Sequence, residues 1–242
     1  MNVIKLDAID STNEFLKQFL NEQQVENYTV ITAENQTKGK GQMGAVWESE
    51  TGKNLIMSIL IKDFITDINQ IFNLNCIVSL SVIQVLQQYS IPKLSIKWPN
   101  DIMSDTKKIG GILIENSIKN DGTIFSVVGL GLNCNQTNFE HLPRASSLVA
   151  VTNRFFDKEE LLLLIVDKMK KNILSWQKQS ALMWQSYTDM LFKKGIPMPF
   201  QDANGQNFMG IIQGVSSIGK LQILLENDTI AEFDLKEIQL LY

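Results

Sequence analysis

The stretch KKIGGILIENSIKNDGTIFSVVGLGLN, residues 107–133, predicts the centre of the fold. Two apolar runs, 109–118 and 124–132, flank Asn120-Asp121-Gly122, and an Asp-Gly pair favours a tight hairpin turn because it tolerates positive φ. Glycine weakens a strand, so glycines in both arms indicate that something other than ordinary packing lies against this backbone. These glycines are Gly110, Gly111, Gly129 and Gly131.

The segments on either side of this hairpin predict an α+β protein with a mixed or antiparallel sheet and flanking helices. Ser11-Thr12-Asn13-Glu14 is typical of a capping box at the start of a helix, and Pro92 follows a helical pattern over 67–89. Periodicity predicts strands over 28–33, 55–61 and 94–98, and two further helices over 157–176 and 181–194.

The character of the sequence changes after Gly195. Short strand patterns, separated by Gly or Asn-Asp turns, are typical of a small β-barrel. They lie near 208–215, 221–225, 230–233 and 238–242. We therefore predict two domains, residues 1–194 and residues 195–242.

The composition excludes several classes of protein. In the 242 residues, 44% are hydrophobic and 20% charged, as in a soluble globular protein, and the net charge of −4 disfavours a nucleic-acid binder. His141 is the sole histidine and the cysteines number two, which leaves no zinc motif and no disulfide framework. Neither a secretory signal nor a continuous apolar run of membrane length is present, so we expect a cytoplasmic protein without a membrane partner.

Two glycine- and lysine-bearing segments are candidates for binding an anion. In Lys38-Gly39-Lys40-Gly41-Gln42-Met43-Gly44, backbone N–H groups can converge on an anion because few side chains block their approach. Lys107-Lys108 opens the first arm of the hairpin, where a lysine is suited to hold a carboxylate or phosphate. The alternatives are a solvated surface loop and a solvated charge pair before an edge strand.

A third segment, Lys97-Trp98-Pro99-Asn100-Asp101, places polar groups directly after a strand. Pro99 fixes φ, so Asn100 and Asp101 leave the strand in a set direction, where Asp101 is suited to hold Mg²⁺ or orient a nucleotide. The alternative is an ordinary Asn-Asp turn beside an exposed lysine. At the end of the hairpin, Asn133 offers a donor and an acceptor that suit the edge of a base.

The order and spacing of these motifs resemble the biotin protein ligases over essentially the whole chain. The resemblance rests on Ser11-Thr12-Asn13, on Gln36 with the glycine loop and Trp47, and on the three later segments Lys97–Asp101, Lys108–Glu115 and Gly129–Asn133. It implies the class II synthetase-like fold of biotin and lipoate ligases, with a small SH3-like β-barrel at the C-terminus. Since the sequence begins directly with these motifs, we expect the monofunctional type that lacks a DNA-binding domain.

The resemblance implies a catalytic domain at 1–194 that joins biotin to ATP and then transfers biotin to a lysine of a biotin carboxyl carrier domain, with Mg²⁺ as cofactor. The implied catalytic residues are Lys108, Lys40 and Asp101, with Asp101 also serving the metal. Biotin would be bound by Ser11, Thr12, Asn13, Gln36, Gly39, Gly41, Gly111 and Gly129. The nucleotide would be bound by Lys40, Gln42, Trp47, Lys97, Asn100, Asn133 and Gly131.

The glycine loop departs from the family's usual pattern, G-R-G-R-R-G-R-x-W, because Gln42 and Ala45 stand where arginines often occur. A lysine such as Lys40 keeps a charge but lacks the bidentate fork of arginine. Two alternatives remain: a lipoate or octanoate transfer enzyme of the same fold, and a non-enzymatic sensor of biotinyl-adenylate. We expect no nucleic-acid partner, while a homodimer through a sheet edge is compatible with the sequence.

Overall fold

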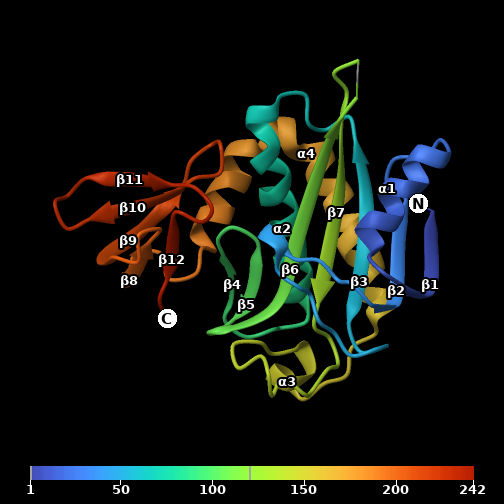
Figure 1. The fold of residues 1–242 in the computed structure, drawn as a ribbon, viewed down its shortest axis with the longest axis horizontal. Coiled ribbons are helices and arrows are strands. Elements are labelled where there is room, and N and C mark those ends of the chain that lie inside the picture. Colours follow the sequence, from blue (N-terminus) through green and yellow to red (C-terminus); the bar gives the residue numbers. More distant parts are fainter. Residues whose placement is uncertain (1, 120) are drawn as a thin grey trace.

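The computed structural model describes residues 2–119 and 121–242, which form two sheets with flanking helices (Figure 1). The larger sheet has seven strands in the order β1-β2-β3-β7-β6-β5-β4, in which β1 and β2 are parallel and the other neighbours antiparallel. Its strands are β1 (Val3–Ile9), β2 (Val30–Gln36), β3 (Leu55–Lys62), β4 (Leu94–Lys97), β5 (Asp101–Ser104), β6 (Lys107–Ile118) and β7 (Ile124–Leu132).

The second sheet is antiparallel and lies at the C-terminal end of the chain, in the order β11-β10-β9-β8-β12. Its strands are β8 (Pro197–Asp202), β9 (Asn207–Val215), β10 (Leu221–Leu225), β11 (Ile230–Phe233) and β12 (Ile238–Leu240). The helices are α1 (Thr12–Glu22), α2 (Ile71–Gln88), α3 (Leu148–Thr152) and α4 (Lys158–Asp189), with 3-10 turns η1 (Gln42–Gly44) and η2 (Ile68–Gln70). The predicted mixed sheet with flanking helices and small C-terminal β-domain is confirmed.

The predicted hairpin is the pair β6 and β7, and its register aligns the glycines. Gly111 lies opposite Gly131, while Ile118 lies opposite Ile124 at the turn. Gly122 has φ +83°, as an Asp-Gly turn requires, and Asn120 of the predicted turn lies outside the described residues. The same row continues outward to Asp101 on β5 and Ile56 on β3. These four residues therefore share one face of the sheet.

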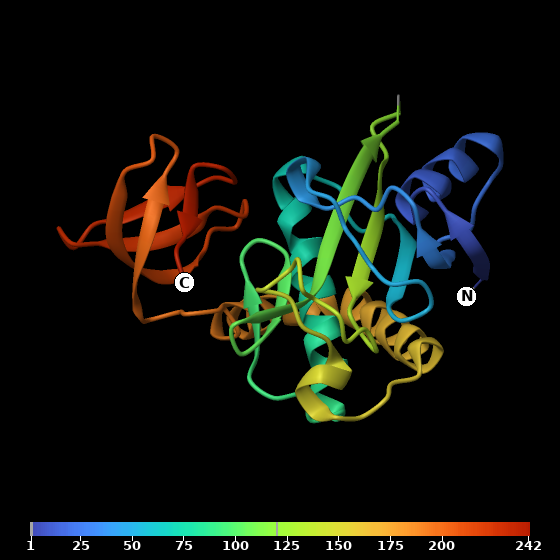
Figure 2. The ribbon, with the colours of Figure 1, turned by 60° about the horizontal axis from the view of Figure 1, so that its bottom comes forward.

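Alternate side chains along each strand point to opposite faces of the larger sheet, and both faces are buried. Ile31, Leu60 and Val127 pack with Leu16 of α1, whereas the adjacent residues of their strands join the main core against α2 and α4. The two long helices lie side by side across that second face (Figures 1 and 2). The segment Ile68–Gln88 is long and apolar enough to span a bilayer, and 61% of its 18-residue apolar window is buried in the protein, which accounts for that composition.

Five elements differ from the sequence prediction. The two helices predicted over 157–176 and 181–194 are one helix, α4, because the intervening Gln177-Lys178-Gln179-Ser180 is polar but contains neither glycine nor proline. The prediction also missed β1, α3 and β8, and it treated the start of β5 as a turn. Asp101 instead begins β5, pairing with Lys97 and Gly111 on either side.

The junction between the two sheets lies at Gly195, whose φ of +71° suits glycine. A second contact is made by Gly219, which also has positive φ and accepts a hydrogen bond on its carbonyl from Trp98 Nε1 at 2.9 Å. A side chain at Gly219 would collide with Phe72 of α2, since its Cβ would lie 2.4 Å from the ring. The small β-domain thus rests directly on α2 and on the residue that follows β4.

We predict that Leu16→Ala lowers the free energy of unfolding by about 3 kcal/mol, because Leu16 is fully buried between α1 and the sheet. Urea denaturation followed by circular dichroism measures the change. Leu174→Ala on the exposed side of α4, where 81% of the residue is accessible, is the matched control and should change stability by less than about 0.5 kcal/mol. A similar loss in both variants would contradict the packing of α1 described above.

Candidate active site

A cavity of about 220 Å³ lies on the face of the larger sheet that also carries α1. It crosses the sheet from β2 to β5, under the N-terminus of α1 and beside the glycine loop (residues 38–47). Of the predicted site residues, those that line it are Ser11, Thr12, Asn13, Gln36, Lys40, Gly41, Gln42, Trp47, Asn100, Asp101, Lys108, Gly111, Gly129 and Gly131. The sequence motifs therefore converge on one cavity.

The β2 end of the cavity carries uncharged hydrogen-bonding groups. The Thr12 backbone N–H and hydroxyl donate to Gln36 Oε1, at 2.8 Å and 3.0 Å. Ser11 is the N-cap of α1, and its hydroxyl accepts from the Glu14 N–H, as the capping box predicts. Ser58, which was not predicted from the sequence, is a fully buried residue of β3 whose hydroxyl lies 2.7 Å from Thr12 Oγ1. Ser58 faces the cavity side because it shares a row with Gly129.

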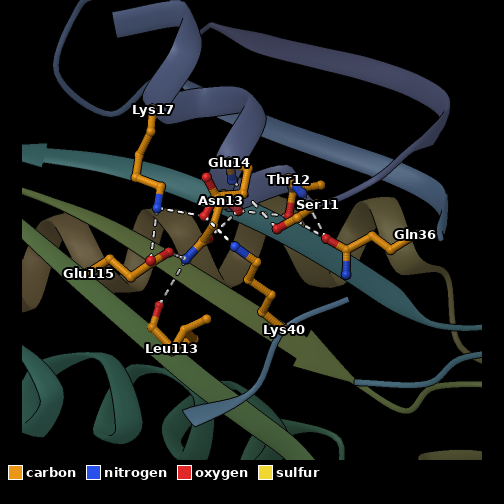
Figure 3. A network of polar contacts seen from close by, with 10 residues as sticks. Ser11, Thr12, Asn13, Glu14, Lys17, Gln36, Lys40, Leu113 and Glu115 are labelled. Carbon is orange, nitrogen blue, oxygen red and sulfur yellow. Dashed lines mark hydrogen bonds and ion pairs between the residues drawn. The ribbon is translucent and has the colours of Figure 1, made fainter. Parts of the chain in front are cut away.

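Asn13 also connects α1 to the sheet. It lines the cavity, and its side-chain amide donates to Glu115 Oε2 at 2.8 Å (Figure 3). Its side-chain carbonyl accepts from the Ser58 hydroxyl at 2.5 Å. A Cβ at Gly129 would lie 2.6 Å from Asn13 Oδ1. Gly129 is therefore required to make room for Asn13, and only indirectly for a ligand.

Trp47 covers two other glycines of the hairpin, Gly111 and Gly131. A Cβ at Gly131 would lie 2.4 Å from Cε2 of the indole, and one at Gly111 would lie 3.3 Å from the indole and from Lys108. The Lys108 ammonium lies 5.7 Å from the centre of the indole ring. Trp47 Nε1 is buried without a hydrogen-bond partner among the described residues. The glycines thus accept a flat aromatic ring against the sheet.

The β5 end of the cavity carries the opposed charges. Lys108 Nζ lies 2.6 Å from Asp101 Oδ1, and Lys97 Nζ lies 3.8 Å from Asp101 Oδ2. Strand pairing with Gly111 fixes Asp101, whose side chain is 17% exposed, while the Lys108 backbone is held by hydrogen bonds with Arg144 and Ser146. Asn100 is buried at the same end and donates to the Ile112 carbonyl at 2.6 Å.

Three predicted residues do not line the cavity. Asn133 donates its side-chain N–H to the Ser146 carbonyl at 2.9 Å and so fixes the end of β7, which differs from the predicted reading of a base. The Lys97 ammonium lies 5.1 Å from the centre of the Tyr242 ring, in the cleft toward the small β-domain. Gly39 lies against the Trp47 backbone, since its Cβ would be 2.3 Å from that carbonyl. These three positions support the site from outside.

A chain of charged groups, also missed from the sequence, joins the glycine loop to α1 and β6 (Figure 3). Glu14 Oε1 lies 2.7 Å from Lys40 Nζ and 2.6 Å from Lys17 Nζ, and Lys17 Nζ lies 2.9 Å from Glu115 Oε1. Hydrogen bonds from Lys17 and Lys40 lower the pKa of Glu14. The i,i+3 spacing of Glu14 and Lys17 on α1 was the one sequence signal for this row of charged groups.

In the part of the chain that the structure describes, neither Cys134 nor His141 is placed to act as a nucleophile at the cavity. Burial raises the pKa of the Cys134 thiol to about 12, so the thiol stays protonated. His141 lies in an exposed turn and does not line the cavity. Within residues 2–119 and 121–242 there is also no cluster of three His, Cys, Asp or Glu side chains arranged to hold a metal ion.

The model of the Biotin/lipoate A/B protein ligase family matches residues 6–133, which is more than half of the chain. The chain belongs to this family. The matched region contains every residue that lines the cavity.

Members of the family with known names are similar to this chain. The bifunctional ligase/repressor BirA of Bacillus spizizenii is 32% identical over 135 residues, 56% of this chain and 41% of that protein. The biotin–[acetyl-CoA-carboxylase] ligase of Mycobacterium tuberculosis is 25% identical over 195 residues, 79% of this chain and 71% of that protein. The chain thus spans about two-fifths of the BirA sequence that it matches.

Solved structures extend the similarity to the whole fold. The biotin protein ligase of Aquifex aeolicus, in complex with biotin and ATP, superposes with a TM-score of 0.80 and 28% sequence identity. The alignment covers 99% of this chain and 98% of that one. Both sheets of the present structure therefore have counterparts in a biotin protein ligase.

We predict that Glu14 titrates below its usual value of 4.5, because ionised Glu14 is hydrogen-bonded to two ammonium groups. The stabilisation from these pairs is then present above pH 4.5 and is lost as the pH falls through the lowered pKa. NMR titration of the carboxyl carbon measures it, and Lys40→Met should move the midpoint upward. Lys38→Met, which removes a loop lysine paired with Asp10, should leave it unchanged.

Proposed function

We propose that this protein is a biotin protein ligase, which activates biotin with ATP as biotinyl-5′-AMP and transfers the biotinyl group to a lysine of a carboxyl carrier domain. The observation that supports this most directly is the separation of polar character along the cavity. Uncharged donors and acceptors lie at its β2 end, and the Lys108–Asp101 pair lies at its β5 end. A substrate with a neutral polar ring and a terminal carboxylate fits this order.

The uncharged end suits the ureido ring of biotin. Thr12 and Gln36 are paired with each other, so a ureido group can exchange partners with them without leaving a buried donor or acceptor unsatisfied. An aliphatic chain would leave the Thr12–Gln36 pair intact but would offer no partner to the Gln36 amide N–H groups, and each polar group buried without a partner costs about 1–3 kcal/mol. This favours biotin over octanoate as the substrate.

The first step joins two anions. An oxygen of the biotin carboxylate attacks the α-phosphorus of ATP, the bond to the β-phosphate oxygen breaks, and pyrophosphate leaves. Lys108, on the rigid strand β6, lowers the repulsion between the carboxylate and the phosphate and stabilises the charge that develops on the phosphoryl oxygens. Lys40 adds a second positive charge from the glycine loop. Trp47 supplies a flat surface for the adenine beside Gly131.

In the second step the amine of an acceptor lysine attacks the carbonyl of the mixed anhydride. The amine loses a proton, an amide bond forms and AMP leaves with the bonding electron pair. No enzyme nucleophile is needed, consistent with the protonated Cys134 and with a His141 that does not line the cavity. Positioning of the two reactants and electrostatic stabilisation account for the chemistry.

Mg²⁺ enters this proposal with ATP. Asp101 is the single carboxylate that lines the cavity in the described chain, and Mg²⁺ is commonly held by one or two carboxylates together with substrate phosphates. When bound, the ion would neutralise phosphate charge. We also propose cytoplasmic action on a carrier domain without nucleic-acid or membrane partners, and the outer strand β1 leaves a sheet edge through which two copies could pair.

We predict that Lys108→Ala lowers the rate of pyrophosphate release by roughly a hundredfold, because the developing phosphoryl charge loses its nearest fixed cation. The assay supplies biotin, ATP and Mg²⁺, with lipoate and octanoate in parallel. Lys107→Ala is the matched control, since the exposed Lys107 side chain contacts the Pro143 carbonyl outside the cavity.

Two results would contradict the proposal. Undiminished pyrophosphate release by Lys108→Ala would remove the assigned role of Lys108. Release with lipoate or octanoate but not with biotin would assign the protein to the other branch of its family, and binding of biotinyl-adenylate without transfer to any carrier domain would indicate a sensor.

We predict that Gln42→Arg slows the dissociation of preformed biotinyl-adenylate several-fold, because Gln42 lines the cavity and a guanidinium can bind a phosphate through two N–H groups. Gln42→Lys should have a smaller effect, since an ammonium is a point charge without that fork. Rapid filtration of the labelled complex measures the rate. Equal effects of the two substitutions would mean that charge alone, and not the fork, retains the intermediate.

A further inference from the structure

Glu14 occupies a central position between the glycine loop and the body of the protein. Its carboxylate oxygen Oε1 accepts from Lys40 of the loop at 2.7 Å and from Lys17 of α1 at 2.6 Å. Lys17 in turn contacts Glu115 of β6, so Glu14 is held from the side opposite the loop (Figure 3). The side chains of Glu14, Lys17 and Glu115 are about one-third exposed or less, which reduces screening by solvent.

Lys38 and Trp47 attach the two ends of the loop to the body of the protein, and residues 40–46 between them have few other connections. The N–H groups of Gly41, Ala45 and Trp47 donate to carbonyls within the loop, and the Lys38 N–H at its start donates to the Asp10 carbonyl. Among side-chain hydrogen bonds and ion pairs of the described chain, the Lys40–Glu14 pair is the one that joins residues 40–46 to another element. Met43 and Val46, the apolar residues of this segment, are mostly exposed and add no packing.

From these contacts we propose that Glu14 is a positioning residue for the glycine loop, holding Lys40 over the cavity and thereby slowing escape of the activated intermediate. This inference rests on the proposed ligase function. An ammonium has three N–H donors, so Lys40 can keep its contact with Glu14 while it donates to a substrate oxygen. Glu14 acts through Lys40 and touches no reacting atom.

The chemistry of the intermediate gives this contact its importance. A mixed anhydride that leaves the cavity is lost to hydrolysis or to reaction with unselected amines, so the rate of loop opening limits how selectively the biotinyl group is transferred. In a loop with Gln42 and Ala45, Lys40 is the cation nearest its centre. The strength of its attachment to α1 therefore matters more than in an arginine-rich loop.

The test compares Glu14→Gln with the parent protein and with Lys38→Gln. Glutamine keeps the shape of the side chain and removes its charge, and Lys38→Gln removes an exposed pair of similar length, Lys38 with Asp10, at the base of the same loop. We expect Glu14→Gln to release preformed biotinyl-adenylate roughly three- to fivefold faster, and Lys38→Gln to stay within about a factor of two. The thermal midpoint should change little in either variant.

A double-mutant cycle with Lys40→Met tests the route of the effect. If Glu14 acts by holding Lys40, adding Glu14→Gln to Lys40→Met causes no further acceleration. An unchanged or slower release in Glu14→Gln, or an equal acceleration with and without Lys40, would overturn the inference while leaving the ligase function intact.

A measurement without ligand tests the positioning role of Glu14 independently of the proposed ligase function. Amide hydrogen exchange in the free protein should be faster at Gly41, Ala45 and Trp47 in Glu14→Gln than in the parent, because these amides report opening of the loop. Unchanged exchange would overturn the positioning role of Glu14 whatever the enzyme assays give. A parent protein that forms no biotinyl-adenylate would instead refute the proposed ligase function, and the proposed effect on retention of the intermediate with it.

Discussion

The register of four neighbouring strands is the constraint on which the site depends. Asp101, Gly111, Gly131 and Ile56 form one row across β5, β6, β7 and β3, and alternation along each strand turns this row toward α1. A slip of one residue would turn Asp101 into the core and the glycines away from Trp47. The cavity is therefore a product of strand pairing before it is a product of any side chain.

The charged side chains of the site are also positioned by regular secondary structure. Lysine side chains are long and mobile, yet Lys108, Lys40 and Lys17 each contact a carboxylate on a different element. Each carboxylate is placed by regular structure: Asp101 by β5, Glu115 by β6 and Glu14 by the first turn of α1. Ammonium groups are in this way oriented by partners that cannot move far, which is how a binding site is preorganised.

Much of the site could be predicted from the sequence because its motifs are local. The capping box at Ser11 and the Asp-Gly turn require only neighbouring residues, and the pairing of Gly111 with Gly131 follows once the turn is placed. The sequence did not show, however, which side chains lie against these glycines. Asn13 covers Gly129, and Trp47 covers Gly111 and Gly131. Both side chains come from parts of the chain that no local pattern connects with the hairpin. Ser58 was missed for the same reason, since a serine within an apolar strand gives no signal of its own.

Gly219 has a consequence for how the molecule unfolds. The Gly219 backbone lies against the Phe72 ring, and its carbonyl accepts a hydrogen bond from the Trp98 indole. Trp98 precedes Asp101 by three positions. The small β-domain thus packs against α2 and is hydrogen-bonded to the segment that leads to Asp101. Unfolding of the small β-domain would remove contacts from α2, and unfolding of α2 would remove contacts from the small β-domain. The two domains should therefore unfold in a single cooperative transition.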